Sequence, residues 1–302
     1  MNFSQLELLR LLPETQFNLS KAAEKVNIVQ SAASRHIQLL EEELGSPLLE
    51  RHGKKILGFT PLGERVIQEI EGIDLAKRNI QTIADDYQAN RNGALHIATT
   101  HTQAKYLLPE PIRKFRAQFP GVTIYMVQSS PGEIIDLLYR HEADIAICTE
   151  KMEDSEKLVI KPCYEWNHVA IVPQGHPLAD AKVTLEKLAS YPLLTYSPGY
   201  TGRSNIEKAF AKHGLDLNIT LSAADSDVIK TYVRLGLGVG IISGASYEPA
   251  NDSDLVSIDL AHLIPRSMTK LAYLKQLYLP TYLRCFIDEL LHAGIGRPVG
   301  ER

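Results

Sequence analysis

The sequence has little cysteine and no long hydrophobic run. Its three cysteines, Cys148, Cys163 and Cys285, are odd in number, far apart and outside any Cys-x-x-Cys or Cys/His pattern. This excludes a disulfide framework and gives no support to a zinc site, so we expect reduced, buried thiols. The most apolar stretch, residues 235–247, is short and rich in glycine. A membrane span needs roughly 20 apolar residues, so no transmembrane helix is expected.

A secretory signal and an excess of positive charge are also missing. Residues 1–14 lack a basic segment before the apolar residues, which Glu7 and Arg10 interrupt, so we expect a cytoplasmic protein. The 32 Lys and Arg residues face 36 Asp and Glu residues, for a formal net charge of -4. This excludes a uniformly basic nucleic-acid coat but leaves room for a local cationic face.

The chain is long enough for about two domains of roughly 150 residues, or three if one is small. It has 302 residues, of which 44% are hydrophobic and 23% charged, a profile that excludes disorder, collagen and fibres. Residues 1–59 carry short helical patterns. From residue 95 onward, short apolar strands alternate with helical stretches.

A long linker helix is expected between these regions, over residues 60–92. Thr60 and Pro61 favour a helix start, because threonine caps free amides and proline suits the first turn. Apolar residues then recur seven positions apart, at Val66, Ile73, Ile80 and Tyr87. Such a narrow seam favours pairing with a second chain, and packing within one chain is the alternative.

The rest of the sequence predicts two Rossmann-like α/β subdomains. Strands are expected at 95–100, 122–128, 144–149, 168–173, 192–197, 219–223, 239–243 and 270–275. Helices are expected near 103–119, 131–140, 184–189, 203–213, 225–235 and 280–292. This alternation is typical of parallel sheets covered by helices. We expect subdomain I over 93–163 and 269–302, subdomain II over 164–268, and a ligand cleft between them.

A helix-turn-helix pattern occupies residues 18–44. Ser20 is expected to cap one helix, and Asn27 to take the tight turn that follows it. The next helix, 30–44, is expected to bury Ala33, Ile37, Leu40 and Leu44. Its exposed N-terminal end then presents polar side chains suited to base edges and phosphates in a major groove: Gln30, Ser31, Ser34 and Arg35.

A short basic turn follows this helix and predicts a wing. Its side chains Arg51, His52, Lys54 and Lys55 suit contact with DNA phosphates. A solvated charged turn explains the same residues equally well when they are taken alone. The order of helix, turn, helix and basic turn is what favours the wing.

The segment NLSKAAEKVNIVQSAASRHIQLLEEELGSPLLERHGKKILGFTPLGE, residues 18–64, resembles the winged helix-turn-helix of LysR-type transcriptional regulators. The resemblance covers essentially the whole chain. It implies an α/β protein with an N-terminal all-α winged helix-turn-helix over 1–59, a dimerising linker helix, and two subdomains like those of a type 2 periplasmic binding protein. Val29 departs from the family, which usually has Ser or Thr before the glutamine; the missing cap costs about 1 kcal/mol.

Two loops predict an anion site. Thr99, Thr100, Thr102 and Gln103 cluster where a strand gives way to a helix, and Thr201, Gly202, Arg203 and Ser204 occupy the equivalent place in the second unit. Helix starts offer free amides, and hydroxyls add donors, although such threonines also serve as plain helix caps. Both loops are expected to face one cleft.

The stretches TTHTQAKYLLP, TYSPGYTGRS and DSDVIKTYVRLGLGVGIIS narrow the resemblance to the CysB-like, sulfur-assimilation branch of the family. By that resemblance, a sulfate-like anion or an acetylserine is contacted by Thr100, Thr102, Gln103, Thr149 and Thr201, with Thr99 and Trp166 as further contacts. The chain ends sooner than many members of the branch.

Enzyme motifs are missing. The chain has no Gly-x-Ser-x-Gly, His-Glu-x-x-His or Asp-x-Asp-x-Asp-Gly segment. Residues 236–240 form only part of a dinucleotide fingerprint and follow a helix, which is the wrong order. His101 and His168 are expected to be hydrogen-bonded structural histidines. Asp225, Asp227 and Lys230 are expected to cap and brace a single helix.

The sequence therefore predicts a homodimeric or homotetrameric regulator that binds double-stranded promoter DNA and is not an enzyme, with no cofactor, metal or membrane partner. The expected effectors are sulfate, thiosulfate, O-acetylserine or N-acetylserine. One alternative is a regulator of sulfonate or sulfate-ester use that senses adenosine phosphosulfate. A solute-binding module without DNA function is the alternative of another class.

Overall fold

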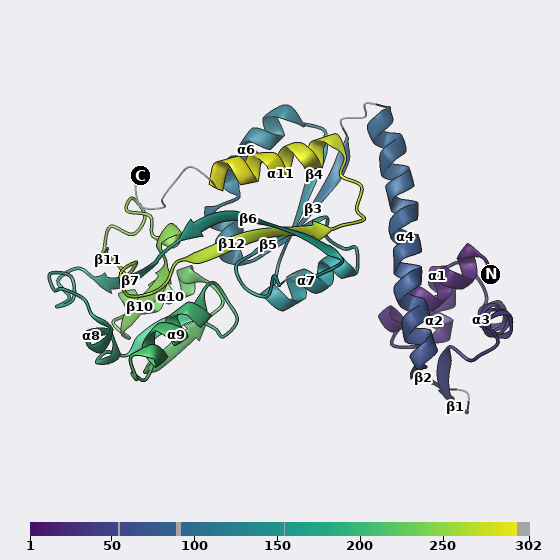
Figure 1. The fold of residues 1–302 in the computed structure, drawn as a ribbon, viewed down its shortest axis with the longest axis horizontal. Coiled ribbons are helices and arrows are strands. Elements are labelled where there is room, and N and C mark those ends of the chain that lie inside the picture. The colour runs from purple at the N-terminus through teal and green to yellow at the C-terminus, as the bar shows by residue number, and fades with distance from the viewer. Residues whose placement is uncertain (54, 89–91, 154, 295–302) are drawn as a thin grey trace. The chain divides into compact units, whose positions relative to one another are not determined.

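The computed structural model describes residues 1–53, 55–88, 92–153 and 155–294 (Figure 1). The chain divides into two compact units, Met1–Thr82 and Ile83–Arg302, each taken by itself below. None of the helices in the described ranges is long and apolar enough to cross a membrane.

The first unit is a small helical domain with a two-stranded hairpin. Leu8, Leu9, Ile37 and Leu40 are almost fully buried, and the small residues Ala22 and Ala23 let the helices pack closely around them. The elements are α1 (Phe3–Leu11), a 3-10 turn (Pro13–Thr15), α2 (Leu19–Lys25), α3 (Gln30–Leu44), β1 (Leu49–His52), β2 (Lys55–Phe59) and the first part of α4 (Pro61–Tyr87).

The helix-turn-helix expectation is confirmed, with two corrections. Asn27 takes a left-handed backbone (φ 56°) between α2 and α3, as expected. The cap of α2 is Asn18, whose side chain accepts from the Lys21 amide at 3.1 Å, and not Ser20. Leu44 is 41% exposed rather than buried, because Gly45 ends the helix there.

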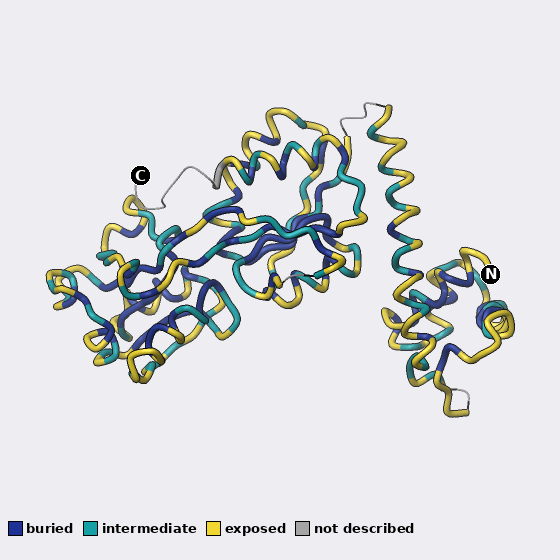
Figure 2. Tube along the Cα trace, viewed as in Figure 1, coloured by how far each residue is buried: buried dark blue, intermediate teal, exposed yellow. Residues whose placement is uncertain are grey.

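Helix α4 begins at Pro61 with Thr60 accepting a hydrogen bond from the Gly63 amide at 3.0 Å, as expected. One end of the predicted apolar seam is packed against the first unit, and the other end is exposed. Val66 packs on the core of the first unit, whereas Ile80 and Tyr87 are 70% and 92% exposed. The exposed part of the helix is visible in Figure 2.

The second unit contains two five-stranded sheets. Chain order and spatial order differ in both, which places segments far apart in sequence side by side. The first sheet has the order β4 (Val122–Gln128), β3 (Gly93–Thr99), β5 (Ile145–Cys148), β12 (Ser267–Leu274), β6 (Leu158–Trp166). The second has the order β11 (Leu255–Asp259), β7 (His168–Pro173), β10 (Val239–Ser243), β8 (Leu193–Tyr196), β9 (Ile219–Ala223).

Helices cover the sheets. In the first, α6 (Pro109–Gln118) and α11 (Thr281–Gly294) pack together on one face and α7 (Pro131–Tyr139) on the other (Figure 1). In the second, Ala170 and Val172 share a core with α9 (Arg203–Lys212), while Val169 and Ile171 share one with α10 (Ser226–Arg234). The remaining helices are α5 (His101–Tyr106), α8 (Leu185–Ala189) and a 3-10 turn (Gly244–Ser246). Because side chains alternate along a strand, successive residues of β7 are buried on opposite faces of the second sheet, one against α9 and the other against α10.

The expectation of parallel sheets holds for part of each sheet, because β3 runs parallel to β4 and β5, and β8 runs parallel to β9 and β10. Strand β12 runs antiparallel to both β5 and β6, and β7 runs antiparallel to β10 and β11. The sequence pattern also missed β6 and β11. The predicted helix 103–119 is divided into α5 and α6, because Pro109 opens a new helix and cannot continue the old one.

The chain crosses from the first sheet to the second after Trp166 and returns before Ser267. The β6–β12 pairing reaches both of these residues, so the first sheet extends two to three residues beyond the boundaries expected from sequence.

The three cysteines are free, and burial raises the pKa of the Cys148 and Cys163 thiols to about 12.

Gly63 lies in α4 where a Cβ would meet the Leu48 carbonyl oxygen at 2.1 Å, whereas a Cβ at Gly72 of the same helix meets nothing within 4 Å. We expect Gly63→Ala to destabilise the first unit by about 1–3 kcal/mol through this overlap. Gly72→Ala should stabilise it by up to about 1 kcal/mol. Amide hydrogen exchange of α1 to α3 in the full chain measures both. Equal protection in the two variants would contradict the close approach.

Candidate effector and DNA-binding sites

The N-terminal end of α3 presents an exposed polar face. Gln30, Ser31, Ser34 and Arg35 are all exposed, and Val29 before them is 69% exposed and provides no side-chain cap. The Arg35 guanidinium lies 3.5 Å from the carboxylate of Glu42, further along the same helix. Ser20 is exposed on α2. The four α3 residues predicted from sequence are thus brought together on one surface.

The wing is an antiparallel hairpin of β1 and β2, in which His52 pairs with Lys55. Arg51 donates to Glu41 at 3.0 Å, and the same carboxylate accepts from the Leu48 amide at 2.8 Å. Arg51 therefore braces the wing against α3, and its charge is partly balanced. His52 is exposed, and Lys54 lies outside the described residues.

In the second unit, three predicted threonines have buried hydroxyls without a hydrogen-bond partner. They are Thr100 and Thr102 at the start of α5, and Thr201 before α9, each 2% exposed. Thr201 also has a left-handed backbone (φ 39°), which is strained for a β-branched residue. Buried hydroxyls are normally paired, so these three groups are candidates for contact with a ligand or an ordered water.

The other predicted residues of the first sheet are tied into the protein. The Thr99 hydroxyl donates to the Ile147 carbonyl at 2.8 Å, so it serves the strand pairing. Gln103 accepts from the Tyr164 hydroxyl at 2.5 Å and donates to Thr269 at 3.3 Å. Burial raises the pKa of Tyr164 to about 12, which keeps it a donor at neutral pH.

Thr269 is a site residue that the sequence analysis missed. Its fully buried hydroxyl accepts from Trp166 at 3.1 Å, accepts from Gln103 and shares a hydrogen bond with Thr149 at 3.3 Å. It lies on β12, more than 100 residues from these partners, where no local pattern points to it. We use the name polar cluster for Thr100, Thr102, Gln103, Thr149, Trp166, Thr201, Gly202 and Thr269.

The second half of the cluster is closely packed. A Cβ on Gly202 (φ 71°) would meet the Ser267 hydroxyl at 2.5 Å and the His168 ring at 2.9 Å. The two residues that follow Gly202 in the chain make contacts outside the polar cluster. Arg203 donates to the Tyr196 carbonyl at 2.6 Å and pairs with Glu207 at 3.0 Å, and Ser204 donates to Glu150 at 3.1 Å. The cluster is therefore lined by neutral donors rather than by Arg203.

Tyr196 lies where the two halves of the second unit meet. Its buried hydroxyl accepts from the Ser243 amide at 3.0 Å. Burial raises its pKa, and the Ser243 amide and the nearby hydroxyls of Ser246, Ser226 and Thr102 oppose that rise. Thr102 of the first sheet's helix thus lies beside a residue of the second sheet, without a hydrogen bond of good geometry.

His168 is not the hydrogen-bonded histidine expected from sequence. Its ring is fully buried and tilted against Trp166 with centroids 4.8 Å apart, and neither ring nitrogen has a hydrogen-bond partner. Burial lowers the pKa of His168 to about 4, and the main chain of Thr201 opposes this only in part. The ring is therefore neutral at physiological pH.

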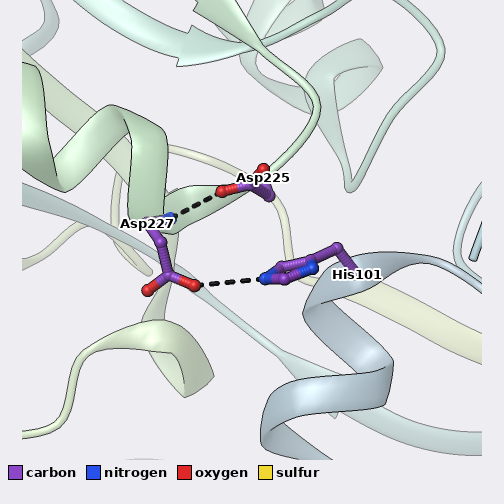
Figure 3. Close-up of side chains that lie close together, drawn as sticks. All are labelled: His101, Asp225 and Asp227. Atoms are coloured by element: carbon purple, nitrogen blue, oxygen red, sulfur yellow. Dashed lines mark hydrogen bonds and ion pairs between the residues drawn. The ribbon is translucent and has the colours of Figure 1, made fainter.

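Asp227 joins α10 to α5, which corrects its expected role within one helix (Figure 3). It accepts from Tyr106 at 2.7 Å, from Lys105 at 2.8 Å and contacts the His101 ring at 3.2 Å, so His101 also has a carboxylate partner. Burial raises the pKa of Asp227, but these hydrogen bonds outweigh it and bring the value to about 2.

The neighbours of Asp227 are partly as expected. Asp225 caps α10 by accepting from the amides of residues 227 and 228. Lys230 pairs with Asp252 at 2.6 Å, both being 4% exposed, rather than bracing α10. His101, Asp225 and Asp227 approach one another closely enough for a metal ion, but Lys105 already neutralises Asp227. The group fits an ion-pair bridge better than a cation site.

Comparison with known families agrees with this architecture. Residues 3–64 match the bacterial regulatory helix-turn-helix protein of the lysR family, and residues 88–294 match the LysR substrate binding domain. The fold and the two sites therefore define a LysR-type transcriptional regulator. The chain belongs to this family, in its CysB-like branch.

Curated relatives match over nearly their full length. The transcriptional regulators SsuR and CysB of Burkholderia cenocepacia are each 40% identical, covering 95% and 100% of this chain and 94% and 96% of their own. The regulator cbl of Escherichia coli is 42% identical over 98% of this chain and 93% of its own.

Solved structures share the fold. The cofactor-binding domain of the Cbl transcriptional regulator is 42% identical, with a TM-score of 0.64 over 69% of this chain and 90% of that one. A full-length OxyR variant from Pseudomonas aeruginosa has a TM-score of 0.71 over 98% of this chain and all of its own, at 20% identity, which supports the fold alone.

We expect Asp227→Asn to lower the free energy of unfolding by about 1–2 kcal/mol at pH 7, a value reduced from the full pKa shift because the side chain is one-third exposed. The folded pKa is depressed, so this stabilisation is complete above about pH 4 and is lost as the pH falls toward 2. Urea unfolding at several pH values measures it, with the exposed Asp216→Asn as control. A pH-independent difference between wild type and Asp227→Asn would contradict the charge bridge.

Proposed function

We propose that this protein regulates genes of sulfur assimilation and cysteine biosynthesis, and that a sulfate-like anion or an acetylserine bound at the polar cluster controls its DNA binding. The observation that carries the proposal is the set of buried, unpartnered hydroxyls of Thr100, Thr102 and Thr201, drawn from both halves of the second unit. Each such group loses about 1–3 kcal/mol while it remains unpaired. A ligand with several acceptor oxygens recovers that loss.

The chemistry of the cluster supports an oxyanion. Hydroxyl and amide groups form hydrogen bonds with an anion without adding a buried charge, and Arg203 is engaged with Glu207. Such neutral donors suit a fully ionised group such as sulfate or thiosulfate, because that anion has acceptor oxygens and needs no acceptor in return. The side-chain amide of Gln103 and the indole of Trp166 are already held in place by Thr269.

For the DNA side, we assign base-edge contacts to Gln30, Ser31, Ser34 and Arg35, and phosphate contacts to Ser20, His52 and Lys54. Arg51 would reach phosphate from β1, where it also donates to Glu41. The exposed Ile73, Ile80 and Tyr87 on α4 suit pairing with a second copy of the chain, so we propose a homodimer as the minimum DNA-binding form.

The proposed control mechanism requires two arrangements of the second unit. The Asp227 bridge joins α5 of one half to α10 of the other, next to the cluster. An anion that contacts both halves stabilises one arrangement over the other, and this difference in affinity shifts the equilibrium. The DNA-binding helices would respond through α4.

A second candidate is sensing of adenosine phosphosulfate by a regulator of sulfonate or sulfate-ester use. CysB, SsuR and cbl proteins match at 40–42%, so identity does not separate them. A thermal-shift panel with sulfate, thiosulfate, O-acetylserine, N-acetylserine and adenosine phosphosulfate does, because a ligand at 100 times its Kd adds about 2.7 kcal/mol. A shift with adenosine phosphosulfate alone would favour the second candidate, and none at all would refute both.

Arg35→Ala should weaken binding to a sulfur-gene promoter about tenfold or more at moderate salt, because an arginine contact to guanine or phosphate contributes about 1–3 kcal/mol. Fluorescence anisotropy at several salt concentrations measures this, with an unrelated duplex as reference. Arg113→Ala, which removes an exposed cation from α6, is the control and should bind normally. Unchanged affinity in Arg35→Ala would remove that residue from the interface.

Thr102→Ala should abolish or weaken stabilisation by sulfate or thiosulfate at least tenfold, because it deletes one of the unpartnered donors. DNA affinity without ligand should stay the same. Thr123→Ala, which truncates an exposed threonine of β4, is the matched control. If thiosulfate shifted the melting temperature of Thr102→Ala as much as that of wild type, the anion would bind elsewhere.

A further inference from the structure

His168 occupies the crossing point between the two sheets. Strand β6 ends at Trp166 in the first sheet, and β7 begins at His168 in the second. The returning chain passes the same place, since Ser267 pairs with Trp166 at the start of β12. The ring therefore lies where the two halves of the second unit meet.

The imidazole is held at the edge of the polar cluster. The centroid of the imidazole ring lies 4.8 Å from the ring centroid of Trp166, whose indole donates to Thr269. Another edge approaches Gly202 so closely that a Cβ there would lie 2.9 Å from both Cε1 and Nε2. Trp166 and Gly202 both belong to the cluster, so His168 adjoins it on two sides.

Both ring nitrogens are buried without a hydrogen-bond partner of good geometry, and the nearby main chain of Thr201 favours the charged ring only in part. This is costly, because an unpaired buried polar atom loses its contacts with water and gains none in return. Thr201, next to Gly202, has an unpartnered hydroxyl as well. Two side chains at the same place thus have polar atoms that are free to contact a bound molecule.

The charged groups around His168 have their own partners. On β6, Glu165 pairs with Arg266 at 3.6 Å, and on α9, Arg203 pairs with Glu207. On β11, Asp259 accepts from Asn167. Tyr164 on β6 and Tyr196 on β8 have pKa values raised by burial and are neutral, as is the Cys163 thiol on β6. Lys270 on β12 donates to the Met152 carbonyl at 3.0 Å. Glu150 accepts from Ser204 near α9.

We propose that His168 takes up one proton when an oxyanion binds at the polar cluster, and that its imidazolium then pairs with the anion. The inference rests on the proposed effector site. An anion near a buried neutral imidazole favours its charged form, because opposite charges attract strongly where water is excluded. The proton comes from solvent, and no covalent bond changes.

The consequence is a pH-dependent affinity with a definite sign. The free ring has a pKa of about 4 and is neutral above pH 5. Binding raises that pKa, so affinity for the anion falls as pH rises, by up to tenfold per unit until the pH passes the pKa of the bound form. Sulfate and thiosulfate are fully ionised over this range, so a proton taken up on binding goes to the protein.

Isothermal titration calorimetry of the full chain with thiosulfate, and separately with sulfate, tests the proposal at pH 6, 7 and 8. Pairs of non-phosphate buffers with different ionisation enthalpies report the number of protons taken up. Wild type should take up close to one proton at pH 6 and bind more weakly at pH 8. His168→Gln should bind at least tenfold more weakly at pH 6, with no proton uptake. His213→Gln, at the far end of α9, is the matched control.

The outcomes separate the two claims. Anion binding by wild type without proton uptake, or equal binding by His168→Gln at pH 6, would overturn the role of His168 and leave the effector site standing. No binding of either anion to wild type would overturn the role of His168 and exclude sulfate and thiosulfate as effectors, and the thermal-shift panel with the acetylserines and adenosine phosphosulfate would then decide the effector site. Should His168→Gln fail to fold, the imidazole nitrogen NMR signals of wild type decide. A histidine signal that moves to the imidazolium range on adding thiosulfate supports the proposal, and unmoved signals refute it.

Discussion

The buried hydroxyl of Thr269 is the contact on which the polar cluster depends. It lies on the returning strand β12 and is hydrogen-bonded to Gln103, Thr149 and Trp166, which come from α5, the end of β5 and β6. These bonds fix the amide and the indole in position. The hydroxyls of Thr100, Thr102 and Thr201 are left unpartnered around them. The paired groups therefore form the scaffold, and the unpaired hydroxyls are the groups that we propose to contact the ligand.

The strand crossings place residues of both sheets at the proposed site. Trp166 and His168 flank one crossing, and Ser267 and Thr269 follow the other. A ligand that contacts these residues bears on the places where the two halves join. The Asp227 bridge adds a second connection through Lys105 and Tyr106. Small changes at such a junction can shift the balance between two packed arrangements.

The sequence predicts local features well and long-range pairing poorly. The turn at Asn27, the start of α4 at Pro61 and most strands follow from caps, periodicity and turn residues, which act within a few positions. The direction of β12, the existence of β6 and β11, and the role of Thr269 depend on partners that are roughly 80 or more residues away in the chain. Thr99 shows the converse, since its place in the predicted loop is right but its hydroxyl serves strand pairing. The sequence predicts only structural roles for Asp227 and His168, because the residues that contact them where the two halves of the second unit meet are distant in the chain.

The central claim is that an oxyanion in the second unit changes how the first unit binds DNA. The most direct measurement is the affinity and bend angle of a sulfur-gene promoter bound by the full chain, by anisotropy and footprinting, with and without saturating thiosulfate or an acetylserine. The account predicts that at least one of these ligands changes the footprint or the bend, because the ligand-bound and ligand-free arrangements hold the DNA-binding helices differently. Identical affinity, footprint and bend under every ligand that binds the protein would contradict it.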